Sequence, residues 1–443
     1  RYPPGYRTIP LKTVLDWSEH ETDPGQRGSG FAKAVEMCNN NGHCRKFDAG
    51  TMCPSYRVTL DEQHLTRGRA NTLRLALSGQ LGPDAFVSDA LHATLDLCVS
   101  CKGCKRECPT GVDMAKMKIE FLHHYRQRHG LKFRDRLVAY LPRYAPLASR
   151  LSPLMNVLQG TVKGHLDFAP QRSLPKWHRD EIPPDPPLAK GGARSAGGLE
   201  VALFIDTFNR YFEPEIARAA LAVLRAAGYV VHLARAVHGG RPLCCGRTFL
   251  AAGLVDEAGR EALRVITALK PYVERGVPVV GLEPSCLLGL RDEFLSLLPG
   301  AETAKLGMNA FLLEEFLVRE HAAGRLDLKL RPLRENKALL HGHCHQKAFA
   351  VMPDVERVLR LIPGLEVETI ESSCCGMAGS FGYEAAHYDV SMRMAELSLL
   401  PRVRAAKSDE IVVADGTSCR HQIWDGAGRP AFHVAQVLQA ALA

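Results

Sequence analysis

Four cysteines in the first third of the chain are closely and regularly spaced. Cys98, Cys101 and Cys104 follow one another at intervals of three, and Cys108 comes four positions later, directly before Pro109. In proteins with this spacing a tight loop directs three thiolates to one iron-sulfur cube and the fourth to another cluster. Zinc sites instead use pairs of cysteines separated by a longer loop. The spacing therefore predicts a [4Fe-4S] cluster.

A less regular group of cysteines precedes this motif. Cys38, Cys44 and Cys53 keep a terminal Cys-Pro but supply three thiols where a complete motif has four. By the crossover rule, Cys53 is the expected fourth ligand of the first cluster, which leaves Cys38, Cys44 and Cys108. Two alternatives stay open for this second site: a second cluster completed by His43 or built with three irons, or an empty, degenerate site.

Positive charge gathers around the first motif. Residues 101–150 hold 12 basic and 4 acidic side chains, so this stretch alone accounts for the +8 net charge of the chain. A cube with four thiolates is anionic, and nearby positive charge offsets it. The basic stretch is therefore expected to balance a cluster, and no nucleic-acid binding is predicted.

Two Cys-Cys-Gly triplets mark the second half of the chain. They are Cys244-Cys245-Gly246 and Cys374-Cys375-Gly376. Adjacent cysteines rarely form a disulfide with each other, because such a bridge strains the peptide between them. The triplets therefore indicate metal binding or thiol redox chemistry.

Cys344 and Cys419 each follow an expected strand, so with the second triplet four thiols are predicted to meet at the carboxyl ends of parallel strands. The site would hold a metal ion such as zinc, or a cluster. His343 and His345 flank Cys344 and are candidate cofactor ligands, proton donors or hydrogen-bonded loop residues.

The first triplet belongs to a second copy of the same unit. The segment ending at Cys286 matches the one ending at Cys419 at an offset of 133 residues. The expected strand entries at Gly228-Tyr229 and Gly364-Leu365 match at a slightly larger offset of 136 residues, at which Phe208 occupies the position of Cys344. The first copy therefore keeps Cys244, Cys245 and Cys286.

The elements that must position these residues predict a mixed fold: an α-helical ferredoxin-like N-terminal domain followed by two pseudo-repeated α/β modules rich in cysteine. Short β-branched runs that alternate with helices predict strands at Val201–Ile205, Tyr229–Leu233, Val277–Gly281, Ala338–His341 and Ile411–Ala414. The expected domains are residues 1–130, a helical segment with a Pro/Gly-rich linker over 131–198, and the two modules over 199–336 and 337–443.

Composition places the chain among ordinary globular proteins. Its 443 residues are 46% hydrophobic, and no run of about 18 apolar residues predicts a membrane span. Fourteen cysteines without a secretory signal favour a reducing compartment, so the protein is expected to be cytoplasmic or peripheral on the inner membrane. A leucine-rich helical stripe between residues 137 and 158 is expected either in the core or against a membrane or partner. The chain opens without Met, so we expect an upstream segment.

On these motifs the chain resembles the C-terminal iron-sulfur half of FAD-linked oxidases that act on D-2-hydroxy acids, a group that includes D-2-hydroxyglutarate and D-lactate dehydrogenases. The motifs that carry the resemblance are Met52-Cys53-Pro54-Ser55-Tyr56, Thr66-Arg67-Gly68-Arg69-Ala70, and Leu95 through Pro109. The Cys-Cys-Gly modules resemble those of glycolate oxidase iron-sulfur subunits and of the B subunit of heterodisulfide reductase, which holds non-cubane clusters. The broken first motif and the three-cysteine first module depart from these families.

The resemblance implies a flavin domain upstream of Arg1 that takes a hydride from the substrate. This chain would then relay single electrons to a quinone, a cytochrome or a flavoprotein. No flavin or nicotinamide fingerprint occurs within the chain itself. Two other functions stay open: a thiol or disulfide reductase with a cluster at the Cys-Cys-Gly site, and a zinc-stabilised interaction domain.

Overall fold

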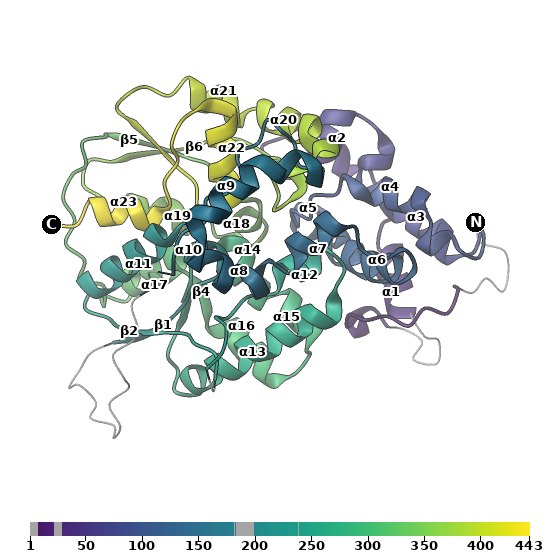
Figure 1. Cartoon of the computed structure of the whole chain (residues 1–443), viewed down its shortest axis with the longest axis horizontal. Helices are drawn as coiled ribbons and strands as arrows, with labels where there is room; N and C mark the ends of the chain where they lie inside the picture. The colour runs from purple at the N-terminus through teal and green to yellow at the C-terminus, as the bar shows by residue number, and fades with distance from the viewer. Residues whose placement is uncertain (1–7, 22–28, 181, 183–198, 238) are drawn as a thin grey trace.

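The computed structural model describes residues 8–21, 29–180, 182, 199–237 and 239–443. A helical N-terminal region and an α/β region lie at opposite ends of the molecule (Figure 1). The mixed fold expected from the sequence is confirmed. Apart from Ile182, the stretch expected as the core of the linker, residues 181–198, lies outside the described residues.

The N-terminal region is built from short helices and turns. Its α-helices are α1 (Ser29–Glu36), α2 (Pro54–Thr59), α3 (Thr66–Leu77), α4 (Asp89–Asp96), α5 (Gly103–Glu107) and α6 (Met114–His129). Asp113 caps α6 by accepting a hydrogen bond from the Lys116 N–H at 3.0 Å. Within α6, the fully buried Glu120 accepts hydrogen bonds from Leu15 and Trp17, each at 3.0 Å. This carboxylate fastens the N-terminal segment onto the helical core.

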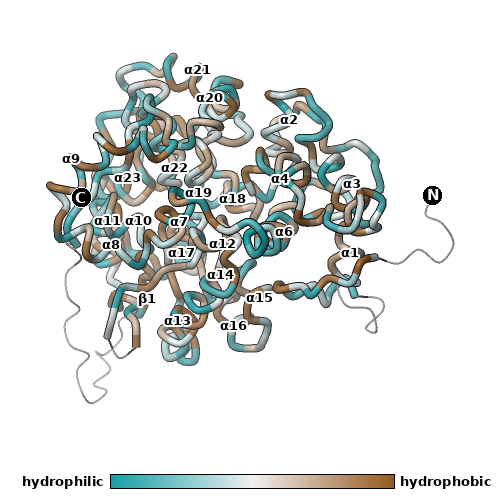
Figure 2. The backbone as a smooth tube through the Cα atoms, turned by 45° about the vertical axis from the view of Figure 1, so that its right-hand side comes forward, coloured by the Kyte–Doolittle hydropathy of each residue, from teal (hydrophilic) through white to brown (hydrophobic). Residues whose placement is uncertain are grey.

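Three helices connect the two regions: α7 (Phe133–Ala139), α8 (Leu141–Arg150) and α9 (Ser152–Val162). The inner side of α8 and α9 packs on a cluster that includes Trp177, Tyr211 and Phe212. In Figure 2, α9 lies at the edge of the molecule. Among the described helices, none combines the length and the hydrophobicity needed to cross a bilayer.

The first α/β module contains a four-stranded parallel sheet in the order β2-β1-β3-β4. Its strands are β1 (Glu200–Phe204), β2 (Val230–Leu233), β3 (Val279–Gly281) and β4 (Ala310–Leu312). Its helices are α10 (Thr207–Tyr211), α11 (Pro214–Ala226), α12 (Arg247–Ala251), α13 (Val255–Glu274), α14 (Pro284–Leu290), α15 (Glu293–Leu297), α16 (Ala301–Asn309) and α17 (Leu313–Ala322).

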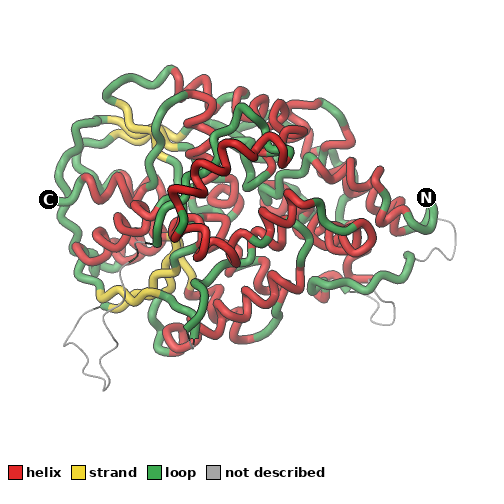
Figure 3. Tube along the Cα trace, in the orientation of Figure 1, coloured by secondary structure: helices red, strands yellow, loops and turns green. Residues whose placement is uncertain are grey.

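The second module contains a three-stranded parallel sheet in the order β6-β5-β7. Its strands are β5 (Lys337–Leu340), β6 (Glu366–Thr369) and β7 (Glu410–Val413). Its helices are α18 (Cys344–Ala348), α19 (Met352–Leu359), α20 (Tyr388–Glu396), α21 (Leu399–Arg404), α22 (Thr417–Ala427) and α23 (Val434–Ala440). Figure 3 shows the two groups of strands apart from each other, with the helical region beyond them.

The two modules share one hydrophobic core. Strand residues of both sheets, such as Val279 and Leu340, belong to the same buried cluster, and α11 of the first module packs against α23 of the second. The five expected strands are present as β1, β2, β3, β5 and β7. Of the other two, β6 follows the entry at Gly364-Leu365 that the repeat alignment matched, whereas β4 was not predicted. Its three residues, Ala310, Phe311 and Leu312, include no β-branched side chain and follow a helix directly, so no strand signal marks them.

Candidate metal centres

The structure describes all fourteen cysteines as free thiols, twelve of them buried and two, Cys98 and Cys108, half-buried. Clustered thiols in such surroundings are suited to metal ligation. They gather at three places: a loop in the helical region and the strand ends of each module.

The first place is a cavity lined by Cys53, Cys98, Cys101 and Cys104. Cys98 follows α4, Cys101 lies two residues before α5, and Cys104 lies in the first turn of α5. Cys53 directly precedes α2. The loop turns inward because Ser100 and Lys102 adopt positive φ angles of 50° and 59°. The structure thus brings together the four thiols that the crossover rule groups into one cluster site.

Burial makes free thiolates costly in this cavity. It raises the pKa of Cys101 and of Cys104 well above the usual value, and neighbouring acidic groups add to the rise. For Cys101 these neighbours include Cys344, Cys104 and Cys53. A bound cationic centre, such as cluster iron, would offset the free-energy cost of burying the thiolates. The donor set therefore fits a cubane.

Cations surround the cavity. The buried Arg69 places a guanidinium nitrogen 3.6 Å from Cys53 Sγ and another 2.9 Å from Ser55 Oγ. Lys118 Nζ donates to the backbone carbonyl of Cys98 at 2.7 Å. These charges counter an anionic thiolate set, and of the two residues only Lys118 belongs to the basic stretch over residues 101–150.

The irregular upstream group lies in the core of the helical region, where Cys38, Cys44 and Cys53 belong to one buried cluster and Cys108 packs against it. Burial raises the pKa of Cys44 to about 11, and the charges of Cys53 and Cys38 contribute to the rise. The Cys108 sulfur lies 3.3 Å from Thr110 Oγ1. His43 is exposed in a 3₁₀ turn, and no described contact joins its ring to a thiol.

The second place lies at the strand ends of the second module. Cys344 begins α18, Cys374 and Cys375 follow β6, and Cys419 lies in the first turn of α22. All four are at most 8% exposed. The Gly376 N–H lies 3.4 Å from Cys374 Sγ.

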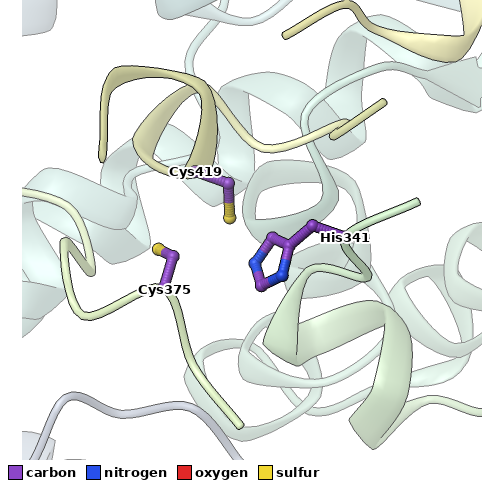
Figure 4. A group of neighbouring side chains, drawn as sticks. All are labelled: His341, Cys375 and Cys419. Carbon is purple, nitrogen blue, oxygen red and sulfur yellow. The ribbon is translucent and has the colours of Figure 1, made fainter. Parts of the chain in front are cut away.

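A histidine that the sequence analysis did not select completes this group. The ligand atoms of His341, Cys375 and Cys419 lie within 4.8 Å of one another. Figure 4 shows the His341 ring and the two thiols turned toward a common space. His341 Nδ1 is 2.8 Å from Ser372 Oγ, while its buried Nε2 has no hydrogen-bond partner. A buried, unpartnered ring nitrogen beside two thiols is a suitable metal ligand.

Two thiols of this group favour the thiolate form. Hydrogen bonding to the Cys374 thiol, aided by His343 and Lys347, lowers the pKa of Cys344 to about 6 against the effect of burial. Hydrogen bonds to Cys374 and Cys419, aided by His341, lower the pKa of Cys375. Thiolates are the ligand form of cysteine, so this group is prepared for a metal or cluster.

The two selected histidines have other partners. His343 caps α18, with Nδ1 accepting a hydrogen bond from the His345 N–H at 3.1 Å. The ring of His345 lies 3.1 Å from the Ser100 carbonyl oxygen and 2.9 Å from an Arg247 nitrogen. His345 therefore joins loops of the three thiol groups, whereas His343 shapes the start of α18.

The third place, in the first module, holds Cys244, Cys245 and Cys286. Cys245 Sγ and Cys286 Sγ are 2.9 Å apart, and the Gly246 N–H lies 3.4 Å from Cys244 Sγ, as Gly376 does from Cys374. The residue of the first module that corresponds to Cys344 is Thr207, not Phe208 as the sequence alignment predicted. Thr207 begins α10 after the cap Asp206, just as Cys344 begins α18 after its cap His343.

The sequence alignment was wrong by one residue because it took its offset from the residues just before β2 and β6 and applied that offset to β1 and β5. Strand pairing shows that β1 and β5 are offset by 137 residues, whereas β2 and β6 are offset by 136. Phe208 instead packs beside Phe212 in the aromatic cluster, and a Thr207 hydrogen bond reaches Cys244.

A further buried group, Glu314, Asp415 and His433, has its ligand atoms within 4.8 Å of one another. Asp415 accepts hydrogen bonds from Val434 N and Gln346 Nε2 at 2.9 and 2.8 Å, and His433 Nε2 contacts the Leu282 carbonyl at 3.1 Å. Glu314 belongs to the first module and Asp415 and His433 to the second, so this group forms a buried contact between the two modules.

Two parts of the chain match known protein domains. Residues 34–112 match the 4Fe-4S dicluster domain and residues 338–424 match the cysteine-rich domain. The chain resembles the iron-sulfur part of known oxidoreductases.

Three relatives illustrate the likeness. D-2-hydroxyglutarate dehydrogenase of Pseudomonas putida is 26% identical over 92% of the chain, and the match covers 43% of that enzyme. One subunit of the anaerobic glycerol-3-phosphate dehydrogenase of Escherichia coli is 28% identical over 68% of the chain and 73% of its own length. The glycolate oxidase iron-sulfur subunit of Escherichia coli is 22% identical over 92% of the chain and 94% of its own length. The chain thus spans less than half the length of the D-2-hydroxyglutarate dehydrogenase it matches.

Proposed function

We propose that this chain is the electron-transfer portion of a flavin-dependent D-2-hydroxy-acid dehydrogenase. Electrons would arrive from FAD in a domain outside the chain and leave to a quinone, a cytochrome or a flavoprotein. The support is the resemblance to oxidoreductases together with the arrangement of the thiol groups.

One observation carries the proposal: Cys101 of the first site and Cys344 of the second module lie in the same buried cluster. That cluster also contains Cys374, Cys375 and Cys419. Helix α5 packs on α18, so the two ligand loops are in direct contact. The arrangement gives electrons a short route between the two sites through protein that excludes water.

Cys53, Cys98, Cys101 and Cys104 would hold a [4Fe-4S] cluster, which when bound supplies one-electron acceptance. Arg69 and Lys118 offset its negative charge. Cys344, Cys374, Cys375 and Cys419, with His341, would hold a second redox centre, either a non-cubane cluster or a metal ion such as zinc. We assign the three-thiol group of the first module, and Cys38, Cys44 and Cys108, as further metal-binding candidates.

Burial argues against a disulfide reductase. The four thiols of the second module are between 2% and 8% exposed, which leaves a disulfide substrate little access to a sulfur. A zinc-only interaction domain is disfavoured by the match of residues 34–112 to a 4Fe-4S dicluster domain.

Electron transfer by the chain can be tested with a reduced viologen as donor and a water-soluble quinone as acceptor, under anaerobic conditions. We expect the chain to catalyse this transfer and Cys101→Ser to abolish it. Equal rates for the two proteins would contradict the proposal. The same donor with a small disulfide as acceptor tests the reductase alternative, for which we expect no turnover.

A further inference from the structure

We propose that the outer face of α8 and α9 docks on an anionic lipid surface. Of the twenty exposed large hydrophobic side chains in the described part of the chain, seven fall between residues 133 and 162. They are Phe133, Leu147, Leu151, Leu154, Val157, Leu158 and Val162. Phe133 begins α7, whereas the other six lie on α8, on α9 or at Leu151 between them. Such a concentration of exposed apolar side chains on two consecutive helices marks an interaction site.

Helix α9 has the character of an interfacial helix. Ser152–Val162 contains no charged residue. Its inner side is anchored by Asn156 and Gln159, which donate to the Trp177 and Pro175 carbonyls at 2.9 and 3.2 Å. Its outer side presents Leu154 and Val157, which are 54% and 67% exposed. In Figure 1, α8 and α9 lie on the face turned toward the viewer.

Basic residues outnumber acidic ones along this part of the chain, where Arg134 and Arg143 pair with Asp135 and Glu257. Residues 131–166 contain six Lys and Arg but one acidic residue, Asp135. Arg150 and His165 flank α9 in sequence, and Lys176 lies in the segment to which α9 is hydrogen-bonded. These three side chains are exposed and form no ion pair within the described residues. Apolar side chains flanked by basic ones match the chemistry of an anionic membrane surface.

The charge also argues against a second copy of the chain as the occupant. In a twofold dimer the same patch meets itself, so the basic side chains of the two copies would face each other and repel. A bilayer with anionic headgroups instead satisfies the apolar and the basic parts together.

Docking would bring the first module close to the lipid. Helix α8 packs on α10, and Thr207 at the start of α10 hydrogen-bonds to Cys244. One helix thus separates the docking face from a thiol group. A lipid-soluble quinone is then the favoured acceptor; this choice rests on the proposed function, whereas docking itself does not.

Vesicle flotation of the 443-residue chain tests the proposal. We expect binding to vesicles of phosphatidylcholine and phosphatidylglycerol, and much weaker binding to phosphatidylcholine alone or at 1 M salt, where the Debye length is about 3 Å. The double variant Leu154→Asp, Val157→Asp should lower binding about tenfold or more, since it puts charge into the apolar face.

Met308→Asp is the matched control, because Met308 is also exposed, at 71%, but lies on α16 away from this face. It should bind as the unsubstituted chain does. Circular dichroism should show all variants folded. Failure of the unsubstituted chain to bind anionic vesicles would overturn the proposal, as would equal binding by the double variant. A dimer in light scattering that the double variant dissociates would overturn it in favour of a second copy.

Discussion

His345 Nε2 lies 2.9 Å from a guanidinium nitrogen of Arg247. His345 directly follows Cys344 of the second module, and Arg247 comes two residues after Cys245 of the first. The same ring contacts the Ser100 carbonyl oxygen, next to Cys101. One pair of side chains thus joins the loops of all three thiol groups.

Arg247 is expected to be central to the stability of this junction. It also pairs with Glu293, which in turn pairs with Lys102 at 2.7 Å. Replacing Arg247→Met removes one partner of a largely buried ion pair and leaves His345 without its contact. We expect a loss of about 2–4 kcal/mol in the free energy of unfolding, measured by denaturant titration. Arg360→Met, whose partner Glu356 is on α19 and whose side chain is half exposed, is the control and should cost less than about 1 kcal/mol. A similar small cost for both would contradict the role of Arg247.

A salt bridge between the helical region and the second module should make stability depend on pH. Burial opposes charge on both partners, but their mutual hydrogen bond outweighs it. The pKa of His387 is raised to about 9 and that of Asp96 is lowered to about 2.

Because the pKa of His387 is raised on folding, its contribution is full below its unfolded value of about 6.5 and is lost as the pH rises through about 9. The contribution of Asp96 is present above about pH 4 and is lost as the pH falls toward 2. His387→Gln should therefore lower the free energy of unfolding most between about pH 4 and 6.5. The expected loss is about 1–2 kcal/mol, because solvent screens the interaction at the partly exposed Asp96. Chemical denaturation at several pH values measures this, and a cost that did not shrink above pH 9 would refute the assignment.

Gly376 is expected to tolerate no side chain. Its φ is +85°, and a Cβ would overlap the Ser391 carbonyl oxygen of α20. Gly376→Ala should lower the free energy of unfolding by about 2–4 kcal/mol, because alanine is strained at this left-handed φ and its Cβ displaces α20. Gly379 is the matched control, because its φ is +66° but no atom lies within 4 Å of the added Cβ. Gly379→Ala should cost about 1 kcal/mol. Equal melting-temperature shifts for the two variants would show that the contact with α20 is unimportant.

Thr207→Cys should restore a fourth thiol to the first module. The Thr207 side chain occupies the position of Cys344 and already reaches Cys244, so a sulfur there would join three existing thiols. We expect tighter metal retention against a chelator, by about tenfold or more. Phe208→Cys, one residue along, should give no such gain. If Phe208→Cys rather than Thr207→Cys gave the tighter metal retention, Phe208 would be the counterpart of Cys344, as the sequence alignment predicted.

The sequence was sufficient for the thiol groups and the class of fold, because both depend on local patterns. Cysteine spacing indicated the loop between α4 and α5, and β-branched runs indicated the strands. His341 was not selected because its ring comes close to the thiols only once β5 and β7 pair in register, which places Cys419 nearby. The Arg247–His345 contact likewise spans 98 residues, and no local pattern reports it.

The metal content of anaerobically prepared chain tests the central claim most directly. Iron, acid-labile sulfide and zinc would be measured together with the paramagnetic resonance spectrum after dithionite reduction. We expect about four irons and four sulfides for the site of Cys53, Cys98, Cys101 and Cys104, with further iron or zinc for the second module. Cys101→Ser should remove the cubane signal and leave the metal of the second module in place. Zinc without iron or sulfide would contradict electron transfer as the role of this chain.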